Sequence, residues 1–184
     1  MATEEVREEE KLETLAERWQ KKRVFVRELA GKYDEIYRQL LEQPRVYKTK
    51  EMSFKGGPAL FSKTPINPQS AMITQAIETH LDVLAPGMYG QKHGHMNSAV
   101  FYILDGKGYD VHDGVRYDWE PGDACIVQNG CVHQHFNADT TRPARYVVFK
   151  GKPLFLFFHM MFQRMVDYPP KEPLPGWEDF QPED

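Results

Sequence analysis

The sequence predicts a mainly β protein, in which one jelly-roll or small barrel follows a helical N-terminal extension. Short strand-like segments recur between turn dipeptides, of which the clearest are Asp105-Gly106, Asp113-Gly114 and Pro121-Gly122. Apolar residues at helical spacing fill the chain before Pro44, and five prolines and six acidic residues crowd its end. These observations predict a helical extension at 1–45, a barrel at 46–166 and a Pro-rich acidic tail at 167–184.

The N-terminal extension carries two runs of apolar residues three or four positions apart: Leu12, Leu15 and Trp19, and then Val26, Leu29, Tyr33, Ile36 and Leu40. That spacing is typical of an amphipathic helix. Pro44 ends the pattern, because proline lacks the N–H that a helix interior needs. A helix with its own apolar face must pack on something, so we expect it to lie across the barrel or against a second subunit. A homodimer or higher homo-oligomer is therefore the expected assembly.

The barrel strands are expected in the segments between turns, at 77–83, 99–104, 124–127, 145–150 and 154–161. The first alternates apolar and polar residues, as half-buried strands do. The last is the richest apolar run of the chain, and we expect it to be another strand.

Two His-x-His pairs stand out, His93 with His95 and His133 with His135. Side chains alternate between faces along a strand, so the members of each pair share one face. A single pair is often only solvated or hydrogen-bonded, but two pairs on antiparallel strands can aim imidazoles at a common point. Imidazole binds iron, copper, nickel and zinc, and a site that keeps open positions usually has three protein ligands. Three of these histidines would suffice.

Glycines at fixed distances accompany the two pairs. Gly87, five residues and His93-x-His95 are followed by Gly106, and then by Gly122, five residues, Gln128-x-Gly130, His133 and Asn137. This order resembles the two sequence motifs of the cupin superfamily. The resemblance implies a single cupin double-stranded β-helix.

The chain departs from the cupin motifs at two points. Ala99 or Val100 stands where the first motif usually carries a glutamate ligand, and Gln128 replaces the proline that usually opens the PxG of the second. Without the glutamate, the site resembles the three-histidine iron sites of the gentisate and salicylate ring-cleaving dioxygenases.

The resemblance to these dioxygenases implies roles for four histidines. His93, His95 and His133 would bind the metal. His135 corresponds to the histidine beside the substrate, which makes it the candidate catalytic acid or base.

Strand parity adds the expected neighbours of these histidines. Ala99, Phe101 and Ile103 share the face of His93 and His95, and Asn137 shares the face of His133. We expect Ala99, Phe101, Ile103 and Asn137 to line the substrate pocket. Phe101 stands where the dioxygenases carry an arginine for the substrate carboxylate, so the resemblance does not fix the substrate.

The expected function is metal-dependent catalysis, first as a non-haem Fe(II) dioxygenase that oxidises a small phenolic or other bidentate oxygen ligand with O2. Three neutral ligands leave the charge of the metal uncompensated and leave positions open for substrate and O2. Two alternatives stay open: a lyase, isomerase or hydrolase with Mn, Ni or Zn, and a non-enzymatic cupin that binds a small molecule. Imidazole discriminates weakly among first-row metals, so the ligand set does not choose.

Composition argues against several other classes. A net charge of -4 over 184 residues gives no electrostatic case for nucleic acid. The richest apolar run, 154–161, is too short to span a bilayer. The N-terminal sequence MATEEVREEE lacks the apolar core of a signal peptide, so the cytoplasm is the expected location.

Four residues outside the expected ligand set are also candidates for chemistry. Cys125 and Cys131 form no disulfide framework, and we expect them in the core. His80 faces either the cavity or the surface, and His112, beside a turn, is expected to be exposed.

Overall fold

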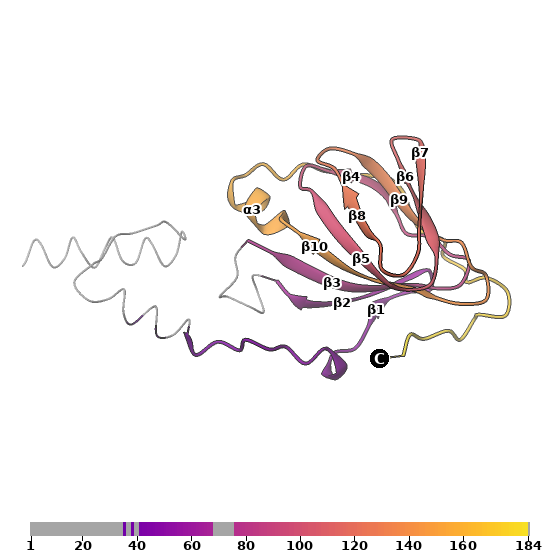
Figure 1. Ribbon diagram of the computed structural model, residues 1–184, viewed down its shortest axis with the longest axis horizontal. Coiled ribbons are helices and arrows are strands. Elements are labelled where there is room, and N and C mark those ends of the chain that lie inside the picture. The colour runs from indigo at the N-terminus through magenta and orange to yellow at the C-terminus, as the bar shows by residue number, and fades with distance from the viewer. Residues whose placement is uncertain (1–34, 36–37, 39–40, 68–75, 184) are drawn as a thin grey trace, which may run out of the picture. The chain divides into compact units, whose positions relative to one another are not determined.

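Two antiparallel β-sheets face each other in the unit Pro44–Asp184 of the computed structural model (Figure 1). The structure describes residues 35, 38, 41–67 and 76–183. The chain divides into two compact units, Met1–Gln43 and Pro44–Asp184. Nearly all of the helical extension expected at 1–45 therefore lies outside the described residues, and its bounds stay a prediction.

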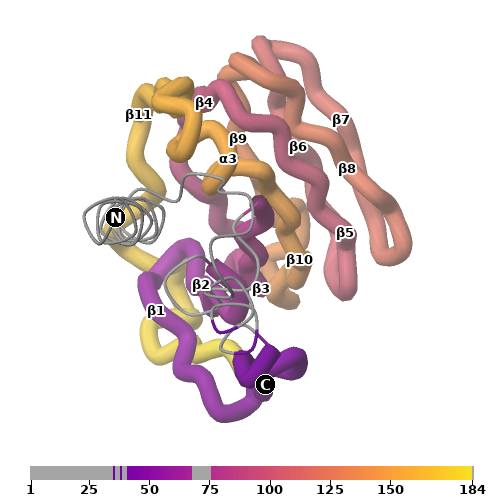
Figure 2. The backbone as a smooth tube through the Cα atoms, turned by 90° about the vertical axis from the view of Figure 1, so that its left-hand side faces the viewer, coloured from indigo at the N-terminus to yellow at the C-terminus, as the bar shows by residue number. Residues whose placement is uncertain are grey.

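The larger sheet has six strands in the order β1-β2-β3-β10-β5-β8. They are β1 (Lys55–Gly56), β2 (Leu60–Ile66), β3 (Glu78–Leu84), β10 (Ala144–Lys150), β5 (Ala99–Asp105) and β8 (Ala124–Val127). The smaller sheet has five strands in the order β11-β4-β9-β6-β7. They are β11 (Gln163–Asp167), β4 (Lys92–His95), β9 (Val132–Asn137), β6 (Gly108–His112) and β7 (Val115–Trp119). The expected mainly β jelly-roll is confirmed, and Figure 2 shows β7 and β8 together at one side of it.

The core lies between the two sheets and follows the alternation of the strands. Along β5 the side chains of Ala99, Phe101 and Ile103 are buried, whereas those between them are exposed. They pack with residues of both sheets, namely Leu84, Trp119, Val127, Ala144 and Tyr146. Burial of this apolar surface is the main favourable contribution to folding.

A second apolar cluster lies under the C-terminal tail. Phe61 of β2 and Val83 of β3 pack there with Leu174 and Phe180 of the tail. The Phe61 and Phe180 rings meet edge to face at 5.7 Å. The indole N–H of Trp177 donates to the carbonyl of Thr140. The tail thus covers the barrel, while the predicted boundary at 166/167 stays a prediction.

The segment 154–161 is not a strand, contrary to our expectation. Residues Lys152–Phe157 form the short helix α3, and the next strand, β11, begins only at Gln163. Pro153 lies in the first turn of the helix, where its missing N–H costs nothing and its fixed φ favours a helix. A continuous run of apolar residues has no periodicity that distinguishes a helix from a strand. Within the described residues, no helix is long and apolar enough to cross a membrane.

Gly108 shapes the barrel wall near the histidines. A Cβ atom at this position would lie 2.0 Å from the carbonyl oxygen of Phe136 and 2.4 Å from the ring of Trp119. Glycine at the start of β6 therefore allows β9 and the Trp119 indole to approach closely. That approach brings the Trp119 indole N–H within hydrogen-bond distance of Asp110, which lies on β6 two residues after Gly108.

Candidate metal centre

Three histidines from two neighbouring strands converge inside the barrel. His93 and His95 lie on β4, and His133 lies on β9, directly opposite His93 in the antiparallel register. One ring nitrogen from each of the three lies within 4.8 Å of the other two. Residues on one face of neighbouring strands are spaced closely enough to meet in this way. The structure therefore brings together the three ligands expected from the sequence.

Each of these imidazoles is held by a backbone carbonyl at its Nδ1 atom. His93 Nδ1 lies 3.2 Å from the oxygen of Gln91, His95 Nδ1 lies 2.7 Å from that of Asn97, and His133 Nδ1 lies 3.2 Å from that of Cys131. A carbonyl only accepts, so each Nδ1 carries the proton and donates it. The lone pair is then on Nε2. In metal-binding histidines, a hydrogen-bond acceptor at one ring nitrogen fixes the other as the ligand atom in the same way.

The environment keeps the three ligands neutral. Burial lowers the pKa of His133 to about 2 and that of His93 to about 4, and the charges of neighbouring histidines add to the effect. Burial also lowers the pKa of His95. Neutral imidazole is the form that binds metal, so the lone pairs are available at neutral pH. The donor set, its protonation and its geometry therefore fit a divalent metal ion with open positions.

His135 lies beside the three ligands but makes a different hydrogen bond. Its Nδ1 lies 2.9 Å from the Oδ1 atom of Asp110 on β6, and its ring is 5.2 Å from that of His133. Burial alone would lower the pKa of His135, but the charge and hydrogen bond of Asp110 outweigh it and raise that pKa. The carboxylate thus orients the ring and stabilises the imidazolium, as in other His-carboxylate pairs.

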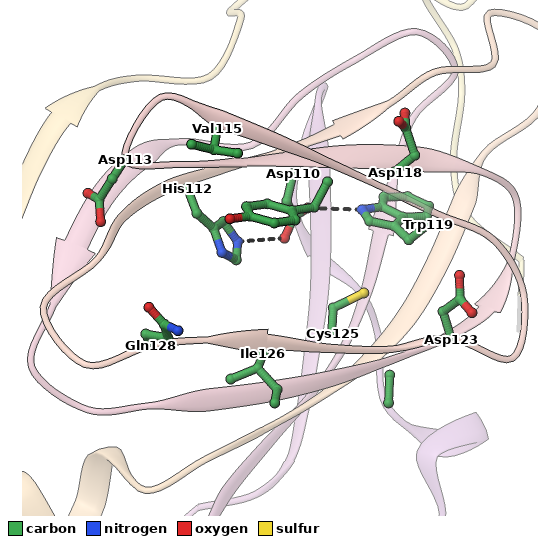
Figure 3. Close-up of a pocket in the computed structure, with 12 residues that line it drawn as sticks. Asp110, His112, Asp113, Val115, Asp118, Trp119, Asp123, Cys125, Ile126 and Gln128 are labelled. Atoms are coloured by element: carbon green, nitrogen blue, oxygen red, sulfur yellow. Dashed lines mark hydrogen bonds and ion pairs between the residues drawn. The ribbon is translucent and has the colours of Figure 1, made fainter.

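Asp110 is the residue that the sequence analysis missed. It is 1% exposed and accepts a hydrogen bond from His135. It also accepts from Trp119 Nε1 at 2.9 Å and from His112 Nε2 at 3.1 Å (Figure 3). Burial would raise the pKa of its carboxyl group, but the charge of His135 and these hydrogen bonds lower it. The available signal was parity, because Asp110 and His112 share one face of β6, and in the register they lie opposite His135 and His133 of β9.

The opposite sheet also presents polar groups to the interior. Asp82 of β3 pairs with Tyr146 of β10, so their side chains share the inner face. The Tyr146 ring lies 5.8 Å from that of His135. Ser62 donates a hydrogen bond to Asp82, whose pKa is raised by burial. The interior facing the histidines is therefore partly polar, which the alternation of β3 had not indicated.

An ion pair joins the ends of β3 and β10 on this inner face. Lys150 Nζ lies 3.1 Å from Glu78 Oε1, and His80 Nε2 lies 2.7 Å from the same oxygen. The His80 hydrogen bond and the charge of Lys150 hold the pKa of Glu78 at about 2, against the effect of burial. His80 lies opposite Val148 in the register, and Val148 packs against the core. Of the two positions expected for His80, the cavity side or the surface, the structure therefore shows the inward-facing one.

The four expected pocket residues occupy different surroundings. Phe101 meets the ring of His135 edge to face at 5.0 Å, and Ala99 is a small buried residue on the same strand face. Ile103 lies deeper, in the core cluster. The Asn137 amide donates to the backbone carbonyls of Leu84, Ala85 and Arg142. The structure thus shows a fold-stabilising role for Asn137, and its place in a substrate pocket stays a prediction.

Two of the remaining expectations have structural outcomes. His112 is not exposed as expected, because its hydrogen bond to Asp110 draws it inward and leaves its side chain 14% exposed. Cys125 and Cys131 are both free thiols, the first half-buried and the second buried. Burial raises the pKa of Cys131 to about 11, so it is a neutral thiol at physiological pH.

Comparison with known proteins points to one superfamily. Residues 80–150 match the cupin domain family. The chain is 32% identical over 76 residues to a 5-aminosalicylate 1,2-dioxygenase of Comamonas sp, an alignment that covers 41% of this chain and 20% of that protein. The chain thus spans about a fifth of the length of this curated relative.

Solved structures show the same fold. The salicylate 1,2-dioxygenase of Pseudoaminobacter salicylatoxidans superposes with a TM-score of 0.55 at 17% identity, over 71% of this chain and 34% of that one. A mutant of the Bacillus subtilis oxalate decarboxylase OxdC gives 0.55 at 17% identity, over 60% of this chain and 30% of that one. Family match, fold and the two histidine motifs agree: the barrel has the cupin jelly-roll fold, and residues 80–150 match the cupin domain family.

Proposed function

We propose that this protein is a non-haem Fe(II) dioxygenase that oxidises a small phenolic or other bidentate oxygen-ligand substrate with O2. One observation carries the proposal: the three candidate ligands are neutral imidazoles, and no carboxylate of the described residues joins their cluster. Three neutral ligands would leave the charge of a ferrous ion uncompensated, so its remaining positions would favour anionic oxygen ligands together with O2.

The relatives support the same reaction class. The aligned Comamonas protein is named for a dioxygenase reaction on an aminosalicylate, and the superposed enzyme for one on salicylate. Both names describe aromatic rings with oxygen substituents. The shared part is about one barrel, so the specific substrate of this chain does not follow from theirs.

We assign the acid–base role to His135. Its pKa is raised by Asp110, so once neutral it is a stronger base than an isolated imidazole. A substrate hydroxyl bound beside His133 would pass its proton to His135, and Asp110 would stabilise the resulting imidazolium. Because Asp110 holds Nδ1, the proton would be taken at Nε2.

The substrate wall that we propose consists of Ala99 and Phe101. Phe101 meets both His135 and Tyr146 with its ring, at centroid distances of 5.0 and 5.3 Å. An aromatic wall of this kind favours a flat ring stacked or edge-on beside the metal. Ala99 lies two residues before Phe101 on the same face of β5 and is the smaller of the two side chains.

The assembly that we propose is a homodimer or higher homo-oligomer. The outer face of the larger sheet exposes Val100, Tyr102 and Leu104 on β5, and Ile126 and Phe149 on its neighbours. Contiguous apolar surface of this kind marks an interaction site on a folded protein. A second copy of the chain is the occupant that the expected oligomer supplies.

The reaction is tested by O2 consumption. Protein reconstituted with Fe(II) under anaerobic conditions is mixed with aerated solutions of hydroxybenzoates, catechols and diketones in turn. We expect iron-dependent O2 uptake with at least one class, abolished in His93→Ala. Turnover without O2, or with Zn, Mn or Ni in place of iron, would instead assign the site to Lewis-acid chemistry. Binding of a compound that is recovered unchanged would assign it to a non-enzymatic cupin.

A further inference from the structure

A second cavity opens where the two sheets separate. It lies between the edge strands β7 and β8 and has a volume of about 520 Å³. Figure 3 shows Val115 on one side, Ile126 and Gln128 on the other, and Asp110 with Trp119 between them. Small-molecule sites in proteins typically measure about 300–1,000 Å³. This seam cavity is therefore large enough for a ligand the size of a single ring or more.

The walls of the seam cavity combine a polar back with an apolar lip. Asp110, His112 and Trp119 form the back, where hydrogen bonds to the carboxylate of Asp110 fix both rings. Val115 and Tyr117 of β7, each 54% exposed, form the lip on one side. An apolar slot with an indole and a few fixed polar groups behind it suits a flat organic molecule.

The charge of the cavity is of one sign. Its charged lining residues are aspartates. Asp118 is paired with Arg116, and Asp110 with His135. Asp113 and Asp123 therefore carry the remaining negative charge. Burial raises the pKa of the Cys125 thiol to about 12, and the charges of Asp110 and Asp123 add to that effect. The thiol points from β8 towards the back wall of the cavity (Figure 3). Because the aspartate charges raise the pKa of a thiol in this position, the electrostatic potential inside the cavity is negative. Such a potential attracts cations and repels carboxylates.

We propose that the seam cavity binds a small aromatic amine in its protonated form, at a site separate from the three-histidine cluster. The ammonium group is drawn by the aspartates, and the ring lies against Val115 and Tyr117 with Trp119 behind it. The site communicates with the metal centre by direct contact. Asp110 accepts from His112 on the cavity side and from His135 on the metal side, and the rings of His112 and His133 are 5.9 Å apart.

Cys125 provides a native probe for this proposal. The wild-type protein is treated with two methanethiosulfonate reagents of similar size, one carrying a trimethylammonium and one a sulfonate, and modification is located by mass spectrometry. We expect the cationic reagent to modify Cys125 about tenfold faster at low ionic strength. Phenethylamine should slow the reaction, whereas phenylacetate should not. Cys131, which is buried and does not line the cavity, serves as the internal control.

A pair of variants ties the result to the cavity. Val115→Arg places a cation on the lip, whereas Val166→Arg places one on β11, at a valine that is similarly exposed, 52% against 54%. We expect the first variant to lose both the preference for the cationic reagent and the protection by phenethylamine, and the second to keep them. Equal rates for the two reagents on wild-type protein, or equal protection by phenylacetate, would overturn the proposal. No step uses iron or O2, so the outcome is independent of the proposed oxygenase reaction.

Discussion

Removal of the Asp110 carboxylate is expected to destabilise the barrel by several kcal/mol. Asp110 is buried and accepts hydrogen bonds from His112, Trp119 and His135. A hydrogen bond to a charged group contributes about 1.5–3 kcal/mol, and loss of one partner leaves buried donors unpaired. The three bonds share one acceptor, so they do not add fully. We therefore expect Asp110→Ala to lower the free energy of unfolding by about 4 kcal/mol, a large part of the about 5–15 kcal/mol typical of a domain.

The measurement is urea unfolding of metal-free protein, followed by far-ultraviolet circular dichroism. Asp118→Ala is the matched control, because Asp118 is an aspartate on the adjacent strand whose ion pair with Arg116 is exposed. Exposed pairs contribute less than about 1 kcal/mol. If Asp110→Ala unfolds at the same urea concentration as Asp118→Ala, Asp110 does not hold the three rings together.

Three further results are expected. His93 and His133 have pKa values of about 4 and about 2, below the usual value of about 6.5, so folded metal-free protein binds fewer protons than unfolded protein as the pH falls below 6.5. The free energy of unfolding of metal-free protein should therefore fall as the pH drops through that range. The raised pKa of His135 opposes this fall. A higher free energy of unfolding at pH 5 than at pH 7, measured in urea, would contradict this prediction. Asn137→Ala removes the amide that donates to three backbone carbonyls, of which that of Ala85 still accepts from the Met88 N–H, and should cost about 2–3 kcal/mol by the same assay; a change below about 0.5 kcal/mol would refute the role. Tyr102→Asp on the outer face of β5 should reduce the mass measured by light scattering, and an unchanged mass would exclude that face as the contact between copies.

The metal ligands could be predicted from the sequence because their geometry is local. Parity places His93 and His95 on one face of a strand whatever the rest of the chain does. The glycine spacing of the cupin motifs then pairs that strand with the one carrying His133, and the register confirms it. The same local rule gave the inward face of β5, with Phe101 buried.

The rest depended on tertiary packing that no local pattern reports. A charged residue on a short strand is ordinarily solvent-exposed, so Asp110 was recognisable only once β6 lay against His135 and Trp119. The alternation along β3 did not decide which set of its side chains faces inward: Val83 packs with Leu174 under the tail, so the polar set that includes Asp82 faces the interior. The apolar segment 154–161 lacked any periodicity, and Pro153 determined its helical start.

The central claim is that His93, His95 and His133 hold one metal ion. It is tested most directly by elemental analysis of protein reconstituted anaerobically with Fe(II) and then desalted. We expect one iron per chain in wild type and in His80→Ala, a control histidine inside the barrel that pairs with Glu78 instead. We expect His93→Ala to lose the bound iron, because only two of the three ligands remain. Iron retained at full occupancy in His93→Ala, or absent from the wild-type protein, would contradict the three-histidine site.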